Sequence, residues 1–196
     1  MLTDPLLRSI ESLLARNPGQ LTQREYCHLA ELVSARANNL LVFGVGLDSG
    51  LWLQANPRGK TVFIESSATW AHEVAAELPA IEIHLVDYGT RRSQWRELLA
   101  GDPVQLELRL PAGLAETAWD TIFVDGPAGF DDDSPGRMKS ICTAAALARR
   151  HGRGEVIVHD CDREVERRCC DRFFFAAELV TAFDRTRHYR IQPDDL

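Results

Sequence analysis

The sequence predicts an α/β fold: a doubly wound, mostly parallel, Rossmann-like sheet that ends in a C-terminal antiparallel hairpin. Three observations predict it. Residues 40–43 are apolar at every position, which is typical of a parallel strand buried on both faces. Further short apolar runs alternate along the chain with segments of helical periodicity. Gly44-Val45-Gly46 directly follows the first run, as the first strand-to-helix turn of such sheets does.

Two helices are predicted before the first strand. Thr3-Asp4-Pro5 is a helix start, because proline is tolerated in the first turn, and Asn17-Pro18-Gly19 ends that helix. Thr22 and Glu25 have the spacing of a capping box, so a second helix begins there. These helices could cover the sheet or close over a site at its edge, and both possibilities stay open.

The rest of the chain alternates between strands and helices. The predicted strands after the first are 61–65, 81–88, 119–124, 155–159, 178–183 and 188–192. The helices between them are a segment through Leu53 that Asp48 or Ser49 caps, 67–78, 93–99, a segment opened by Ser134-Pro135-Gly136, and one from about Glu164. The last two strands, turned by 184–187, form the hairpin.

Length and composition fit a globular protein of a reducing compartment. The chain has 196 residues, 45% of them hydrophobic, and its net charge of −7 argues against a general nucleic-acid binder. Five cysteines without CxxC spacing and the lack of a signal-peptide pattern or long apolar stretch predict a cytoplasmic protein without a membrane partner. We divide it into an N-terminal helical extension, 1–37, and one globular domain, 38–196.

The glycine turn and the acid after the next strand predict a half-site for a nucleoside. Glu65 lies 21 residues after Gly44, where a carboxylate can accept hydrogen bonds from both ribose hydroxyls. Position 49, where the dinucleotide fingerprint needs glycine, is Ser49, so S-adenosylmethionine (SAM) is the better candidate. A tight turn without a ligand is the alternative. The residues predicted to bind the cofactor are Phe43, Gly44, Val45, Gly46, Asp48, Ser49, Glu65, Ser66, Asp125 and Gly126.

Three acids follow the fourth and fifth predicted strands, and one histidine ends the fifth. Neighbouring parallel strands end at one edge of the sheet, so we expect the candidate catalytic residues to converge there: Asp125, His159, Asp160 and Asp162. They could hold a general base beside an acceptor hydroxyl, and Asp125 and Asp160 could also bind a divalent metal. The simpler alternative is that Asp160 and Asp162 cap the next helix or pair with arginines.

Two residues are candidates for contact with the substrate. Arg137 follows a predicted helix start, and a helix N-terminus beside an arginine suits an anionic group such as a carboxylate. A plain helix start with a surface arginine is the alternative. Tyr88 ends the third predicted strand, at the same edge of the sheet as the acids.

Several blocks of the sequence together resemble one family. They are 42–49, 61–65, 119–120, 124–127 (VDGP), 135–138 (PGRM) and 158–166 (VHDCDREVE). The combination looks like the polysaccharide-biosynthesis methyltransferases, which include the plant glucuronoxylan 4-O-methyltransferases and the irregular-xylem 15 proteins. The similarity runs from about Asn38 to the C-terminus.

The resemblance implies a SAM-dependent methyltransferase fold and an O-methyltransferase that acts on a hydroxyl of a uronic-acid-type sugar, or on another small acidic acceptor. It implies that Gly44, Gly46 and Asp48 shape the cofactor site and that Asp125 and Asp160 face the reaction centre. Two alternatives stay open. The chain could transfer the aminocarboxypropyl group of SAM or cyclise it, or it could be a non-catalytic binding protein on the same fold.

Overall fold

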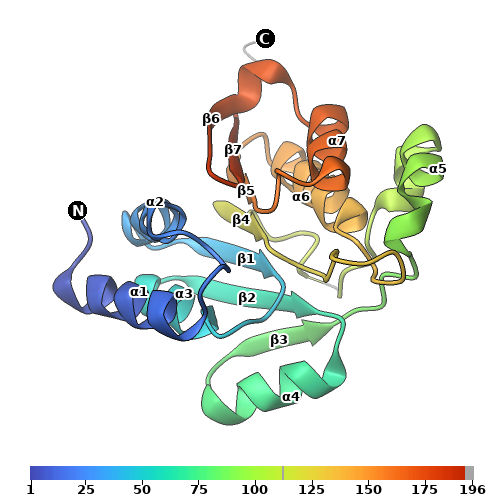
Figure 1. Ribbon diagram of the computed structural model, residues 1–196. Coiled ribbons are helices and arrows are strands. Elements are labelled where there is room, and N and C mark those ends of the chain that lie inside the picture. The colour runs from blue at the N-terminus through green and yellow to red at the C-terminus, as the bar shows by residue number, and fades with distance from the viewer. Residues whose placement is uncertain (112, 193–196) are drawn as a thin grey trace.

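One sheet with helices on both faces makes up the protein (Figure 1). The computed structural model describes residues 1–111 and 113–192, so the end of the predicted domain, 193–196, lies outside the described part. The strands are β1 (Asn39–Phe43), β2 (Lys60–Glu65), β3 (Glu82–Leu85), β4 (Thr121–Val124), β5 (Gly154–Val158), β6 (Leu179–Phe183) and β7 (Thr186–Ile191). Their order within the described residues is β3-β2-β1-β4-β5-β7-β6. The strands β1 to β5 are parallel, and β7 is antiparallel to β5 and β6, which confirms the predicted class and the terminal hairpin.

The helices form one layer on each face of the sheet. They are α1 (Asp4–Arg16), α2 (Gln23–Ser34), α3 (Ser49–Ala55), α4 (Ala68–Glu77), α5 (Trp95–Ala100), α6 (Met138–Arg150) and α7 (Glu164–Phe173), with short 3₁₀ segments at Arg92–Gln94, Pro103–Leu106 and Ala176–Glu178. The first four helices pack on one face and the last three on the other. Of the helices in 1–111 and 113–192, none combines the length and apolar character that crossing a membrane requires.

The alternation of side chains along β1 explains how the sheet is buried on both faces. Leu41 and Phe43 belong to the hydrophobic cluster beneath α6 and α7, whereas Leu40 and Val42 belong to the cluster beneath α1, α2 and α3. Successive side chains of a strand point to opposite faces, so an entirely apolar strand is what a sheet covered on both faces requires. Burial of both faces is therefore the reason that this run lacks polar residues.

The two N-terminal helices share a core with the sheet. Leu6 and Ile10 of α1 and Leu29 of α2 lie in one cluster with Leu40. The capping box of α2 is confirmed, because Thr22 Oγ1 accepts from the Glu25 backbone N–H and the Glu25 carboxylate accepts from the Thr22 N–H. The helices cover one face of the sheet, and the loop between them reaches the site described below.

The third strand is shorter than the sequence predicts. It ends at Leu85, although Val86 N still donates to Glu65 O at 2.9 Å. The chain then turns at Asp87, whose carboxylate accepts from Gly89 N at 2.8 Å. Because β3 is the edge strand among the described residues, the ladder has no partner on its outer side there, and this local turn ends it.

The helix predicted to open at Ser134 begins later, at Met138. Gly136 has a φ of +70°, in the left-handed region, which a right-handed helix cannot contain. Residues 134–137 are thus an irregular approach to α6.

Candidate active site

The candidate site lies at the carboxyl ends of β1 and β4, where the strand order reverses, and open α/β sheets bind ligands at this place. Here two loops touch through their backbones. A Cβ added to Gly126 would lie 2.6 Å from Gly44 Cα, and Gly44 has a φ of +106°. Glycine is therefore needed at both positions for the loops to meet.

Glu65 joins the loops that follow β1 and β2. Its Oε2 accepts from the backbone N–H of Val45 at 3.1 Å, and its Oε1 accepts from those of Ser66 and Ser67 at 2.6 and 2.7 Å. The side chain is buried. These backbone donors fix the direction of the carboxylate, and Oε2 keeps a lone pair for a further donor.

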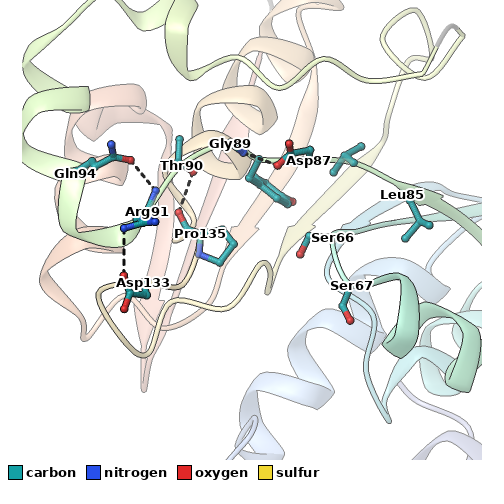
Figure 2. A pocket seen from close by; sticks show the side chains of 12 residues that line it. Ser66, Ser67, Leu85, Asp87, Gly89, Thr90, Arg91, Gln94, Asp133 and Pro135 are labelled. Carbon is teal, nitrogen blue, oxygen red and sulfur yellow. Dashed lines mark hydrogen bonds and ion pairs between the residues drawn. The ribbon is translucent and has the colours of Figure 1, made fainter.

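A groove of about 780 Å³ opens beside these serines. Figure 2 shows Ser66 and Ser67 on one side of it and Arg91 and Pro135 on the other. Its volume lies within the usual range for small-molecule pockets. Tyr88 contributes to the lining but is almost fully buried, with its hydroxyl 3.1 Å from Ser140 Oγ. Burial raises the pKa of Tyr88, so the hydroxyl stays protonated.

Asp48 stands at the N-cap of α3 but forms no capping hydrogen bond there. Its Oδ2 instead accepts from the indole N–H of Trp52 at 3.2 Å, and Ser49 Oγ accepts from Gly46 N at 3.0 Å. Asp48 thus holds the predicted N-cap position, but neither side chain makes a capping hydrogen bond, because both bond elsewhere. Burial, and then the negative charge of Asp125, raise the pKa of Asp48 to about 7.

Asp48→Asn should stabilise the fold near neutral pH and above. Between the ordinary pKa of 3.8 and the raised value of about 7, the folded chain keeps a proton that the unfolded chain has released. Rising pH therefore lowers the free energy of unfolding across this window. We expect urea denaturation to show a gain of at least ~1.4 kcal/mol for the variant at about pH 8, equivalent to one pKa unit, and little gain at about pH 4. Asp162→Asn, at an exposed position, is the control, and an equal gain at both pH values would contradict the assignment.

Asp125, which is partly buried, and His159, which is buried, form a pair. His159 Nδ1 lies 2.9 Å from Asp125 Oδ1, and Gln20 Nε2 donates to Asp125 Oδ2 at 2.8 Å. Burial raises the pKa of Asp125, but the charge of Arg137 and the hydrogen bond from His159 outweigh burial and hold this pKa below its ordinary value. The carboxylate is thus an acceptor, and Nδ1 carries the hydrogen. His159 Nε2 is buried, 3.7 Å from Glu25 Oε2, with no hydrogen-bond partner in the part of the chain that the structure describes.

Asp160 is the centre of an ion-pair cluster. Its Oδ2 lies 2.8 Å from Arg137 Nη2 and 3.0 Å from Arg163 Nη1, and its Oδ1 lies 3.3 Å from Arg185 Nη1. Three guanidinium groups use most of the lone pairs of this carboxylate. Asp160 is therefore better placed to organise cations than to accept a proton.

These acids stand in sequence blocks that a known family shares. Residues 25–103 and 100–189 match the family model described as IRX15/IRX15L/GXM. The chain belongs to the IRX15/IRX15L/GXM family. The match confirms the resemblance that the sequence blocks indicated.

The chain is similar to named proteins of one plant. The chain is 37% identical over 171 residues to glucuronoxylan 4-O-methyltransferase 1 of Arabidopsis thaliana. It is 35% identical over 176 residues to arabinogalactan O-methyltransferase 1 of the same plant. These matches cover 78% and 79% of this chain, but the chain spans only 61% of the length of each relative.

The fold is shared with SAM-dependent methyltransferases. The structure of the O-methyltransferase TomG from Streptomyces achromogenes in complex with SAM superposes with a TM-score of 0.56 at 16% identity, covering 98% of this chain and 91% of TomG. This similarity confirms the Rossmann-like fold of the IRX15/IRX15L/GXM chain.

Arg137 has a different place from the one predicted for it in this IRX15/IRX15L/GXM protein. Its guanidinium is buried, with Nη2 3.3 Å from Asp125 Oδ1 and 2.8 Å from Asp160 Oδ2. Its Nε and Nη1 donate to the carbonyl oxygens of Pro127 and His159 at 3.3 and 3.2 Å. Since the protein itself uses these donors, Arg137 holds the two carboxylates together. It is neither a surface arginine nor free to bind an anionic acceptor.

The donor set Asp125, His159 and Asp160 has ligand atoms within 4.8 Å of one another, which would suit a metal. These residues do not fit a resident divalent cation, because Arg137 Nη2 already lies against both carboxylates. A cation placed among them would lie beside a buried positive charge. We therefore assign the predicted metal ligands to ion pairs with arginine.

Asp162, the fourth predicted catalytic residue, does not join the cluster. Asp160 has a φ of +61°, and the chain turns after it, so Asp162 is exposed on the turn before α7. The N-cap position of α7 is Arg163, so Asp162 is not its cap either.

Sequence reasoning missed three residues that the structure brings to the site in this family member. Gln20 contacts Asp125, Glu25 faces His159, and Arg185 contacts Asp160. Glu25 carried a signal only for its local capping role. Gln20 lies in a loop and Arg185 in a hairpin turn, and no sequence pattern marks either one.

Proposed function

We propose that the chain is a SAM-dependent O-methyltransferase, and that its acceptor is a hydroxyl of a uronic-acid-type sugar, as part of a glycan or a small molecule. One observation carries the proposal. Glu65 and the Asp125–His159 pair lie at the same edge of the sheet, joined through the contact between Gly44 and Gly126. The names of the plant relatives, which are glycan O-methyltransferases, support the acceptor class.

The residues present fit SAM. The Glu65 carboxylate is held by backbone amides, keeps a lone pair for ribose hydroxyls, and stands next to Ser66 at the edge of the 780 Å³ groove. We assign the ribose to Glu65 and Ser66. We assign the methionine end to the remaining predicted residues, which are Phe43, Gly44, Val45, Gly46, Asp48, Ser49, Asp125 and Gly126. When bound, SAM supplies a methyl group on a positively charged sulfur.

We assign the proton transfer to His159. Asp125 accepts from Nδ1 and so fixes the ring, which leaves the lone pair of Nε2 to take a proton from the acceptor hydroxyl. A sugar hydroxyl is a poor nucleophile until its proton leaves, so a base at this point is what O-methylation needs. Arg137 keeps Asp125 ionised and in place. In-line placement of the acceptor oxygen supplies the rest of the catalysis.

His159→Gln should keep SAM binding but lower kcat about 10²–10⁴-fold, the usual contribution of a general base. The assay is mass spectrometry of products with a panel of uronic-acid-bearing oligosaccharides. S-adenosylhomocysteine would indicate methyl transfer, and methylthioadenosine would indicate aminocarboxypropyl transfer instead. His72→Gln, an exposed histidine on α4, is the control. Undiminished turnover of the His159 variant would exclude it as the base.

A further inference from the structure

The loop between α1 and α2 lies against the Asp125–His159 pair of the candidate active site. We call residues 17–21 the strap. Arg185, from the turn between β6 and β7, donates through Nη2 to the carbonyl oxygens of Gly19 (2.7 Å) and Gln20. Its Nη1 lies 3.3 Å from Asp160 Oδ1. One guanidinium thus contacts the backbone of the strap and a carboxylate of the site together.

The turn that carries Arg185 is itself fixed to the start of α2. Thr22 Oγ1 donates to Asp184 Oδ2 at 2.7 Å. The backbone N–H of Arg185 and the hydroxyl of Thr186 donate to Glu25 Oε1 at 2.9 and 2.8 Å. Because these hydrogen bonds fix the hairpin turn to the start of α2, the guanidinium of Arg185 has a defined direction toward the strap.

The strap contacts a pair of residues that is almost inaccessible to solvent. The His159 side chain is 1% exposed and that of Asp125 is 10% exposed. Gln20, in the strap, donates its amide N–H to Asp125 Oδ2 at 2.8 Å. A second hydroxyl of the acceptor sugar, beside the one that gives its proton to His159 Nε2, would offer the same kind of donor to Asp125 Oδ2. In the described arrangement the place of that donor is already taken by the protein.

We infer that the strap is a gate over the Asp125–His159 pair and that Arg185 is the positioning residue that holds it closed, with Gln20 in the place of a second, non-reacting acceptor hydroxyl at Asp125. The inference rests on the proposed function for the identity of the acceptor, but the gate itself rests on contacts within the chain. Acceptor binding then requires the strap to open and the Gln20–Asp125 hydrogen bond to break. The apparent affinity for the acceptor is then the intrinsic affinity multiplied by the fraction of molecules in which the strap is open.

Limited trypsin digestion tests the gate without any methyl transfer. Arg16, exposed at the end of α1, precedes the strap, so cleavage after Arg16 reports its opening. Arg185→Ala should raise the rate of this cleavage by about tenfold or more, because the strap carbonyls lose their donor. Arg187→Ala is the matched control, since Arg187 lies on the same hairpin but pairs with Asp171. Cleavage after Arg96, on α5, must stay unchanged, which separates strap opening from global unfolding.

Steady-state kinetics with an oligosaccharide of the uronic-acid-bearing panel that is methylated test the role of Gln20. Gln20→Ala should lower the KM for the acceptor several-fold and leave the KM for SAM unchanged, because the competing donor at Asp125 is gone. Gln23→Ala, an exposed glutamine on α2, is the control. A strap that is cleaved equally fast with and without Arg185, or a higher acceptor KM for Gln20→Ala, would overturn the gate. Should no acceptor be turned over by any variant while Arg185→Ala still speeds cleavage, the proposed function would fail and the gate would stand.

Discussion

Replacing Glu65 with alanine should abolish SAM binding within the range of isothermal titration calorimetry. In our proposal two ribose hydroxyls donate to this carboxylate, and hydrogen bonds to a charged group contribute about 1.5–3 kcal/mol each. Their loss corresponds to a rise in Kd of about 10²–10⁴-fold. The variant also removes the acceptor of the backbone amides of Val45 and Ser67. The two loops that form the cofactor site therefore lose the side chain that joins them.

Two comparisons make this result specific. Glu77→Ala, at an exposed position on α4, removes a carboxylate outside the site and should bind SAM normally. Glu65→Gln keeps the side-chain size, so a loss of binding without a loss of thermal stability would assign the effect to the charge. Unchanged affinity in Glu65→Ala would remove the ribose role and, with it, the main support for SAM as the cofactor.

Arg137→Met should destabilise the fold by about 3–5 kcal/mol in urea denaturation, the usual cost of breaking a buried ion pair from one side. The methionine fills similar space but leaves Asp125 and Asp160 without the cation that lies against both. Native domains have only about 5–15 kcal/mol of stability in total, so the variant should lie close to unfolding at moderate temperature.

An exposed arginine and a double variant provide the controls for this prediction. Arg91→Met, on an exposed pair with Asp133, should change stability by less than about 0.5 kcal/mol. Combining Arg137→Met with Asp160→Asn should recover part of the loss, because a neutral amide needs no buried counter-charge. A loss in Arg137→Met no larger than in Arg91→Met would show that the carboxylates do not depend on Arg137.

Local sequence patterns predicted most of the fold. The capping box of Thr22 and Glu25 marked the start of α2, and the apolar run 40–43 marked a strand buried on both faces. Both signals work because the pattern and the physical cause lie within a few residues of each other. The convergence of Asp125, His159 and Asp160 was also predictable, since it follows from the parallel order of β4 and β5.

The features that sequence reasoning missed depend on contacts between residues that lie far apart in the sequence. Arg137 was predicted to face an acceptor because only its helix start was visible, and its partners Asp125 and Asp160 lie on two other loops. Arg185 reaches the strap from 165 residues away. Side-chain direction at such distances is decided by tertiary packing, and neither periodicity nor residue type records it.

The contact between Gly44 and Gly126 constrains how this protein can vary. Where two side chains pack, a larger one can be accommodated when its partner becomes smaller, so many pairs of residues are acceptable. Between these loops there is only backbone, and a methyl group at position 126 would fall within 2.6 Å of Gly44 Cα. A larger residue at either position cannot be compensated by a smaller residue at the other, because glycine has no side chain that could be shortened. New acceptor specificities should therefore arise through the strap and the hairpin turn, whose side chains can be replaced one at a time, while the joint between the first and fourth strands stays fixed.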